Sequence, residues 1–177
     1  YDALGVPVFS PDSSRIAYAA ESSGKQLVVI DGKEESYFDR VGTPVFSPDS
    51  KRIAYAANLN DKWFMVVNGK LQKAYDGVGA PVFSPDSKRL AYIAQQNEKQ
   101  FIVVGGKPGE YYDAVSTPVF NSTGDRIAYI AQLSGSQFVV IDERRESIYD
   151  AIGEGSLKFS PDGKRIAYLA QVGDKWM

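Results

Sequence analysis

The chain has 177 residues, with 20 Lys and Arg against 22 Asp and Glu, and a net charge of −2. It contains no His and no Cys, which excludes His-based catalytic triads, thiolate nucleophiles, disulfide bonds and His or Cys metal sites. The balanced charge gives no basic surface for nucleic acid or an anionic membrane, and no apolar run is long enough to cross a bilayer as a helix.

The first segments of the chain predict three short strands. Residues 7–10, Pro-Val-Phe-Ser, form an apolar run that ends in a Ser-Pro-Asp turn, where Pro presets φ and Asp bonds the following backbone. Arg15 then opens an Ile-Ala-Tyr stretch that predicts a second strand, and residues 26–30 predict a third.

A hairpin turn and a fourth strand follow. Asp31 and Gly32 tolerate positive φ, so they predict a two-residue turn between the third and fourth strands. The fourth strand is expected around Phe38 and Asp39. Asp142 and Glu143 occupy the turn position in the fourth copy, which predicts a different turn type there.

This order of segments recurs with a period of 37 residues. The Phe of the first strand steps by 37, 37, 37 and 39, so the fifth copy carries two inserted residues within 153–156. The copies predict innermost strands near residues 7–10, 44–47, 81–84, 118–121 and 157–160. The repeated Asp residues are Asp2, Asp39, Asp76, Asp113 and Asp150, and the repeated Arg residues are Arg15, Arg52, Arg89, Arg126 and Arg165.

A repeat of roughly 40 residues with four short strands is typical of a β-propeller blade. Runs such as residues 27–30 and 64–67 are apolar on both faces, which favours sheets packed between neighbouring sheets. The predicted fold class is all-β: a β-propeller of four-stranded antiparallel blades, forming a single domain over residues 1–177.

The repeat also resembles a known family. Phe-Ser-Pro-Asp-Ser-Lys-Arg-Ile-Ala-Tyr at residues 46–55 and its copy at residues 159–168 are similar to the WD-repeat-like propeller repeat of the TolB family and of prolyl-oligopeptidase-type peptidases. The resemblance implies the propeller architecture. It carries over no catalysis, because the hydrolase domain of those peptidases is absent from this sequence. The fourth copy departs from the pattern at residues 121–125.

Counting strands predicts how the propeller closes. With residues 1–5 as an outermost strand, the chain holds four complete blades, and the strands after residue 157 begin a fifth. Pairing the two ends would close a five-bladed ring by strand swap. Ten residues equivalent to 28–37 are missing from the last copy, so two alternatives stand: a ring with a shortened strand, or a piece of a longer array.

Candidate site residues divide into repeated and unique ones. The repeated Asp and Arg are expected to be structural, whereas variable positions are where binding is sought. Trp63 and Trp176 replace Gln at the start of the third strand and are candidates to anchor a partner or to stack on a sugar, or else to cover the blade below. Lys158 replaces a Val beside the insertion. It is expected either to bind an anion or to point toward solvent. Glu154 lies within the inserted segment.

These features predict a noncatalytic propeller scaffold for another protein or an exposed small ligand, without metal or cofactor. The alternative is a small-ligand or carbohydrate-binding propeller with sites repeated between blades. A glycosidase using Glu154, Asp150 and Asp2 is a third interpretation. Self-association is expected if the ring is an open fragment. The absent Cys and the family resemblance favour a periplasmic or secreted protein.

Overall fold

The computed structural model describes all residues, 1–177, and consists of strands and turns. This confirms the prediction of an all-β chain built from antiparallel sheets. The chain divides into two compact units, Tyr1–Phe83 and Ser84–Met177. No helix of the structure has the length and apolar character needed to cross a membrane.

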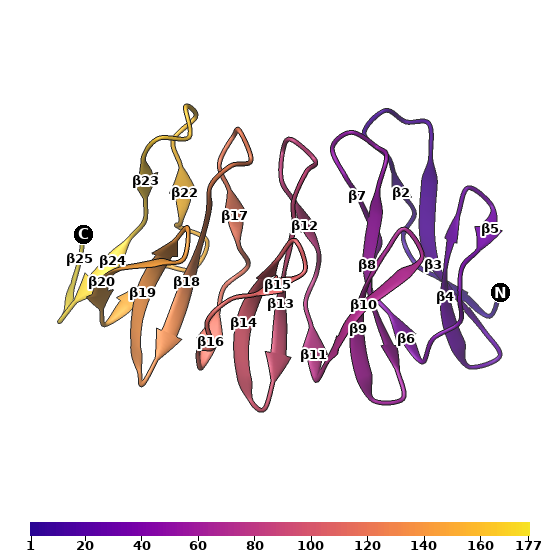
Figure 1. Cartoon of the computed structure of the whole chain (residues 1–177), viewed down its shortest axis with the longest axis horizontal. Helices are drawn as coiled ribbons and strands as arrows, with labels where there is room; N and C mark the ends of the chain where they lie inside the picture. The colour runs from indigo at the N-terminus through magenta and orange to yellow at the C-terminus, as the bar shows by residue number, and fades with distance from the viewer. The chain divides into compact units, whose positions relative to one another are not determined.

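The first sheet shows that one strand assignment was wrong. β1 (Ala3–Leu4) and β2 (Val8–Phe9) both pair with β3 (Ile16–Ser22), which continues through β4 (Lys25–Ile30) to β5 (Lys33–Glu34) at the far edge (Figure 1). The N-terminal segment is therefore half of the first strand of this sheet and not an outermost strand. The predicted strand swap required residues 1–5 as the outermost strand of the last blade. In the structure β1 is instead hydrogen-bonded to β3.

The second sheet repeats this arrangement. β6 (Arg40–Val41) and β7 (Val45–Phe46) pair with β8 (Ile53–Leu59), followed by β9 (Lys62–Val67) and β10 (Lys70–Tyr75). The chain ends one sheet at the aromatic residue and enters the next sheet after the repeated Asp. The aromatic-Asp pair is thus the crossing point between sheets, which explains why residues 1–5 were misassigned.

The third repeat spans the boundary between the two units. Its first-strand pieces, β11 (Gly77–Val78) and β12 (Val82–Phe83), end the first unit, and the second unit opens with β13 (Leu90–Gln96), β14 (Lys99–Val104) and β15 (Lys107–Pro108). β13 pairs with β14 and β14 with β15, all antiparallel. Pro lacks an N–H donor, so its place in β15 fits a strand at the outer edge of the sheet.

The fourth repeat forms a complete sheet within the second unit. β16 (Ala114–Val115) and β17 (Val119–Phe120) pair with β18 (Ile127–Leu133), and β19 (Ser136–Ile141) and β20 (Arg144–Tyr149) complete the sheet. Its unusual segment at residues 121–125 keeps the turn closed: the Gly124 N–H donates to the Asn121 carbonyl at 3.0 Å. This bond is equivalent to the one from Ser13 to Ser10 in the first repeat.

The fifth repeat has shorter strands. β21 (Ala151–Ile152) pairs with β24 (Ala170–Val172), which pairs with β25 (Lys175–Trp176), and β22 (Lys158–Phe159) pairs with β23 (Ile166–Ala167). The sheets together therefore give four to five blades.

The third and fourth strands are joined by one kind of turn throughout. Both turn residues have positive φ in every case, including Asp142 at 49° and Glu143 at 69°. The prediction of a different turn type in the fourth copy was therefore wrong. The twist of the flanking strands selects a turn with two left-handed residues, and it imposes this conformation on Glu143, which has no glycine-like freedom.

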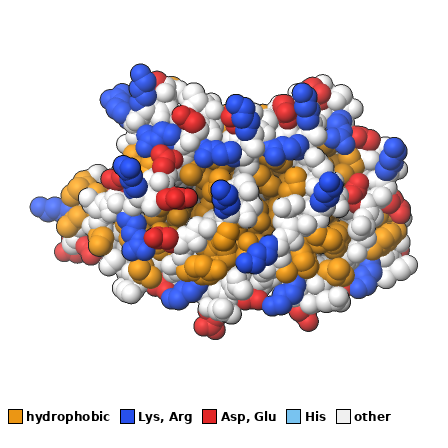
Figure 2. Space-filling view, viewed as in Figure 1, with side chains coloured by type: hydrophobic (Ala, Val, Ile, Leu, Met, Phe, Trp, Pro, Cys, Tyr) orange, Lys and Arg blue, Asp and Glu red, His pale blue; other side chains and the backbone are white.

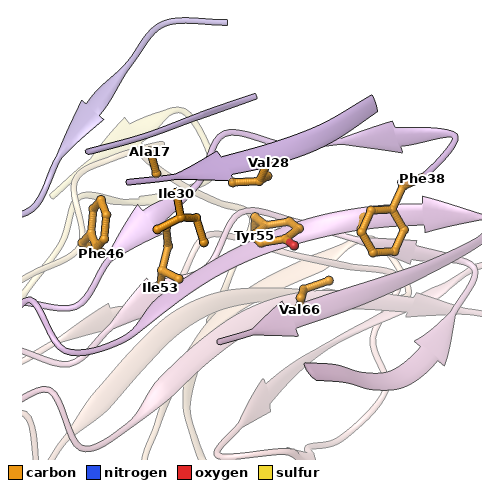
Figure 3. Packing of buried hydrophobic residues seen from close by; sticks show 9 residues of the cluster. Ala17, Val28, Ile30, Phe38, Phe46, Ile53, Tyr55 and Val66 are labelled. Atoms are coloured by element: carbon orange, nitrogen blue, oxygen red, sulfur yellow. The ribbon is translucent and has the colours of Figure 1, made fainter. Parts of the chain in front are cut away.

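Apolar side chains on both faces of the strands build the core. Val28 and Ile30 of β4 pack with Ile53 and Tyr55 of β8, in a buried cluster between the two sheets of the first unit (Figure 3). The alternate β4 residues, Leu27 and Val29, are buried on the opposite face of the same strand. Burial on both faces is the reason that these strands are uniformly apolar.

Candidate functional site

The repeated Asp residues hold the turns between the second and third strands. Asp39 Oδ2 accepts from the Asn60 N–H at 2.8 Å, and Asp113 Oδ2 accepts from the Ser134 N–H at 2.7 Å. The Lys25 ammonium, and after it the Asn60 N–H, keep the pKa of the Asp39 carboxyl below its usual value. Each carboxylate therefore joins the segment that crosses between two sheets to a turn of the sheet that the chain then enters.

The repeated Arg residues reach the following repeat. Within the first unit, the Arg15 guanidinium lies 5.3 Å from the centre of the Phe46 ring. Within the second unit, the Arg89 guanidinium lies 5.0 Å from the Phe120 ring. Arg15 also donates to Asp31 at 2.8 Å. The ring contacts therefore join each Arg to the following repeat, whereas the ion pair with Asp31 lies within the first repeat.

Glu154 and Lys158 lie in the second unit and are both exposed. Glu154 lines a depression of about 250 Å³ together with Ser116, Gln132 and Gln137. Lys158 of β22 stands opposite Ala167 of β23 and does not line that depression. The structure therefore does not bring these two predicted site residues together.

Two of the three carboxylates considered for catalysis, Asp150 and Asp2, have the same structural role. Asp150 Oδ2 accepts from the Gly173 N–H at 2.7 Å, and Asp2 Oδ2 accepts from the Ser23 N–H at 2.7 Å. Both carboxylates hold turns in the same way as the other repeated Asp residues. No cluster of three or more acidic side chains is arranged to hold a metal ion.

Trp63 belongs to a row of side chains in register across the second sheet. Arg40 of β6 stands opposite Asn58 of β8, and Asn58 stands opposite Trp63 of β9. Residues that stand opposite each other share a face of the sheet. Arg40, Asn58 and Trp63, named here the Trp63 row, therefore present a cation, an amide and an indole on one face.

Arg40 and Asn58 differ from their counterparts in all the other repeats, and Trp63 differs from every counterpart except Trp176. The same row of the fourth repeat contains Ala114, Gln132 and Gln137. That of the first repeat contains Ala3, Glu21 and Gln26. Comparing the copies position by position would have identified Arg40 and Asn58 as unusual, but only the pairing register shows that they lie beside Trp63.

The Gln that Trp63 replaces has a structural role elsewhere. Gln26 Oε1 accepts from the Val41 N–H at 2.9 Å, and Gln137 Oε1 accepts from the Ile152 N–H at 2.6 Å. Each bond ties the third strand of one repeat to the first strand of the next. The indole of Trp63 is a donor only, so it cannot form this bond with Val78. The second repeat therefore lacks this hydrogen bond between repeats and has the aromatic side chain of Trp63 in its place.

An open depression of about 330 Å³ lies over the Trp63 row in the first unit. It is lined by the three members of the row together with Asp39 and Asp61. Asn58 Nδ2 donates to the Lys62 carbonyl at 3.2 Å, which leaves its Oδ1 as an acceptor. Trp63 is half-buried, and Arg40 and Asp61 are exposed.

Trp176 occupies the position equivalent to Trp63 in the fifth repeat. Its side chain is 54% exposed, and it stands opposite Gln171 in β24. The first member of its row is Ala151. Trp176 therefore has neither the Arg nor the Asn that accompanies Trp63.

Two further crevices occupy equivalent positions in the two units. One, of about 380 Å³, includes Arg15 and Lys33, and the other, of about 310 Å³, includes Arg89 and Lys107. Their linings differ in charge. The first contains Arg15, Lys33 and Lys51 with Asp31 and Glu35; the second contains Arg89 and Lys107 with Asp125, Asp142 and Glu143.

The fold is similar to that of solved β-propellers. TolB from Acinetobacter baumannii superposes with a TM-score of 0.55 at 20% identity, over 97% of this chain and 49% of TolB. The β-propeller domain of the Trilobed protease from Pyrococcus furiosus, described as having an open velcro topology, gives 0.61 at 16% identity, over 98% of this chain and 64% of that one.

A peptidase also appears among the similar structures. The acylaminoacyl peptidase from Pyrococcus horikoshii gives a TM-score of 0.55 at 17% identity, over 97% of this chain and 36% of the peptidase. No protein-family model and no curated protein sequence matches the chain. The chain has a TolB-like β-propeller fold and spans about half the length of TolB.

Proposed function

We propose that residues 1–177 form one propeller domain that acts as a noncatalytic scaffold for another protein or an exposed ligand. The observation that carries this proposal is the use of the repeated charged side chains. The repeated Asp residues bond backbone turns, and the repeated Arg residues stack on Phe of the next repeat. Apart from the exposed Arg165, the charges that recur from blade to blade are therefore occupied by the fold, and they are not free for acid–base chemistry.

Exposed aromatic and aliphatic residues at the outer ends of the repeats support a protein partner. Tyr37, Tyr111 and Ile148 occupy equivalent positions in three repeats, each directly before the crossing aromatic residue, and they are 46%, 48% and 70% exposed. Figure 2 shows apolar side chains exposed among interspersed Lys, Arg, Asp and Glu. Tyr is enriched at protein interfaces because its rigid ring contributes contact area at little entropic cost.

Photo-crosslinking combined with an activity assay tests this proposal. A photoreactive amino acid at Tyr111 is expected to give a discrete covalent adduct with one protein in cells that express the chain, and the same group at Lys164 serves as the surface control. Glycoside and peptide substrates are expected to give no turnover. Turnover that is lost in the Glu154→Gln or Asp150→Asn variant would overturn the noncatalytic assignment.

A ligand-binding propeller with repeated sites is the second candidate. The two equivalent crevices favour it, because they recur at a fixed offset of two repeats. Their opposite balance of charge argues against a shared ligand. A group that suits a crevice with three cations and two anions is poorly matched to one with two cations and three anions. Titration with a glycan panel separates the candidates: two or more equivalent sites per chain would favour this one over the scaffold.

A further inference from the structure

We infer that the Trp63 row forms a single binding site for a neutral pyranose ring of a glycan. The inference does not rest on the scaffold proposal, because it concerns side chains found together only in the second repeat. It also differs from a repeated-site propeller, since it requires one site per chain.

Trp63 takes the place of a side chain that forms a hydrogen bond in other repeats. Three other repeats use Gln at this position to accept a backbone N–H of the next repeat. A linking hydrogen bond of this kind stabilises the folded chain. Trp63 gives up that bond and lines an open depression. Arg40 and Asn58, which are also unusual for their positions, lie on the same face and line the same depression.

The depression over the Trp63 row contains both hydrogen-bond donors and hydrogen-bond acceptors. The side chains of Arg40 and Asp61 form no hydrogen bond or ion pair in the structure, so a donor group and an acceptor group are both available. Asn58 adds a free amide oxygen. A sugar hydroxyl is at once a donor and an acceptor, and neighbouring hydroxyls on a ring therefore match a mixed set of this kind. The C–H face of a pyranose is apolar and suits the indole of Trp63.

The charges that line the depression distinguish between candidate ligands. Asp39 is paired with Lys25, so the remaining charges at the depression are those of Arg40 and Asp61, which cancel. A nucleotide would also stack on Trp63, but its phosphates would meet a single Arg beside the unpaired carboxylate of Asp61. The balanced charge favours a neutral hydroxylated ligand over a phosphorylated one.

The repeats themselves supply the variants for the test. Trp63→Gln and Arg40→Ala introduce the residues that other repeats carry at these positions, so both are expected to fold. Trp176→Gln is the matched control, because it makes the same change at the equivalent position outside the row. Circular dichroism and the unfolding midpoint verify that each variant is folded.

Isothermal titration with a panel of neutral oligosaccharides measures the binding. We expect at least one glycan to bind at one site per chain. The affinity for this glycan is expected to fall by about tenfold or more in Trp63→Gln. It should fall by less in Arg40→Ala and stay unchanged in Trp176→Gln. Failure of every glycan to bind up to its solubility limit would overturn the inference. So would binding that Trp63→Gln leaves intact, or a preference for nucleoside phosphates over neutral sugars.

Discussion

At the scale of single residues, departures from the repeat have local physical consequences. Tyr55 is fully buried and its hydroxyl has no hydrogen-bond partner. Desolvation raises the pKa of the Tyr55 hydroxyl. In the second unit the equivalent tyrosine of the fifth repeat, Tyr168, has its hydroxyl 3.4 Å from that of Tyr149. Phe38 stands where Tyr149 stands, and it has no hydroxyl to offer Tyr55.

Phe38→Tyr is expected to stabilise the protein by supplying this missing partner. The Phe38 and Tyr55 rings are edge to face with centroids 6.4 Å apart, close to the 5.8 Å of Tyr149 and Tyr168. We expect the free energy of unfolding in urea to rise by about 0.5–1.5 kcal/mol. Tyr55→Phe, which removes the unpaired hydroxyl instead, is expected to be neutral or stabilising. Destabilisation by both changes would show that the hydroxyl is already satisfied.

Glu143→Gly is expected to be stabilising as well. Glu143 has φ 69° in a turn where the other repeats have Gly at the second position. The left-handed conformation costs an ordinary residue about 1–2 kcal/mol, part of which glycine gives back through its greater unfolded-state entropy. A gain of about 1 kcal/mol in urea unfolding is expected. Gly32→Ala, at the equivalent turn position, is the reverse control and should be destabilising.

At the scale of elements, successive sheets are joined by a repeated Arg that lies over a Phe of the next repeat. Arg15 covers Phe46 in the first unit, and Arg126 covers Phe159 at 5.7 Å in the second. Phe46 is only 6% exposed, whereas Phe9, for which the sequence has no preceding Arg of this kind, is 63% exposed. The Arg side chain therefore contributes both a cation–π contact and apolar cover.

Arg15→Ala is expected to lower stability by about 0.5–2 kcal/mol, because it removes the stacking on Phe46 and the bond to Asp31. Urea unfolding measures the change, and Arg15→Lys should give an intermediate value because Lys keeps the charge but not the planar group. Lys164→Ala serves as the control, because Lys164 is an exposed cation without an aromatic ring beneath it. An equal loss in both Ala variants would contradict a role for stacking.

At the scale of the whole molecule, the first and last repeats expose large apolar groups, including Phe9, whose counterparts Phe46 and Phe83 are buried. Val6 and Phe9 are 81% and 63% exposed, and Leu169 and Trp176 are 55% and 54% exposed. Arg165 is also exposed. The last repeat thus presents an Arg and the first repeat a Phe, the two halves of the contact that joins successive repeats elsewhere.

The 177-residue chain is therefore expected to self-associate, with the Arg165 face of one copy on the Phe9 face of another. Sedimentation equilibrium should give a mass that rises above 19.4 kDa with concentration. Phe9→Lys should return the mass toward that of the monomer, because it places a cation opposite Arg165. Ile148→Lys, an equally exposed apolar change on β20, is the control. A constant 19.4 kDa for the unmodified chain would contradict this prediction.

The sequence by itself determined the type of fold and the unit from which it is built. A 37-residue period with apolar runs, Ser-Pro-Asp turns and Gly-containing hairpins predicts antiparallel blades, because strand length and turn chemistry are local properties. It also predicted that the variable Trp63 was a better candidate for binding than the repeated Asp and Arg residues.

The tertiary structure decided which residues meet. Residues 1–5 resemble later fourth-strand segments, yet they pair with β3, because the chain changes sheets between the aromatic residue and the Asp. Arg40, Asn58 and Trp63 are separated by 18 and 5 positions in the sequence, and only strand register places them in one row. Local patterns specify strands and turns, whereas the alignment of one strand against another depends on hydrogen bonds between distant segments.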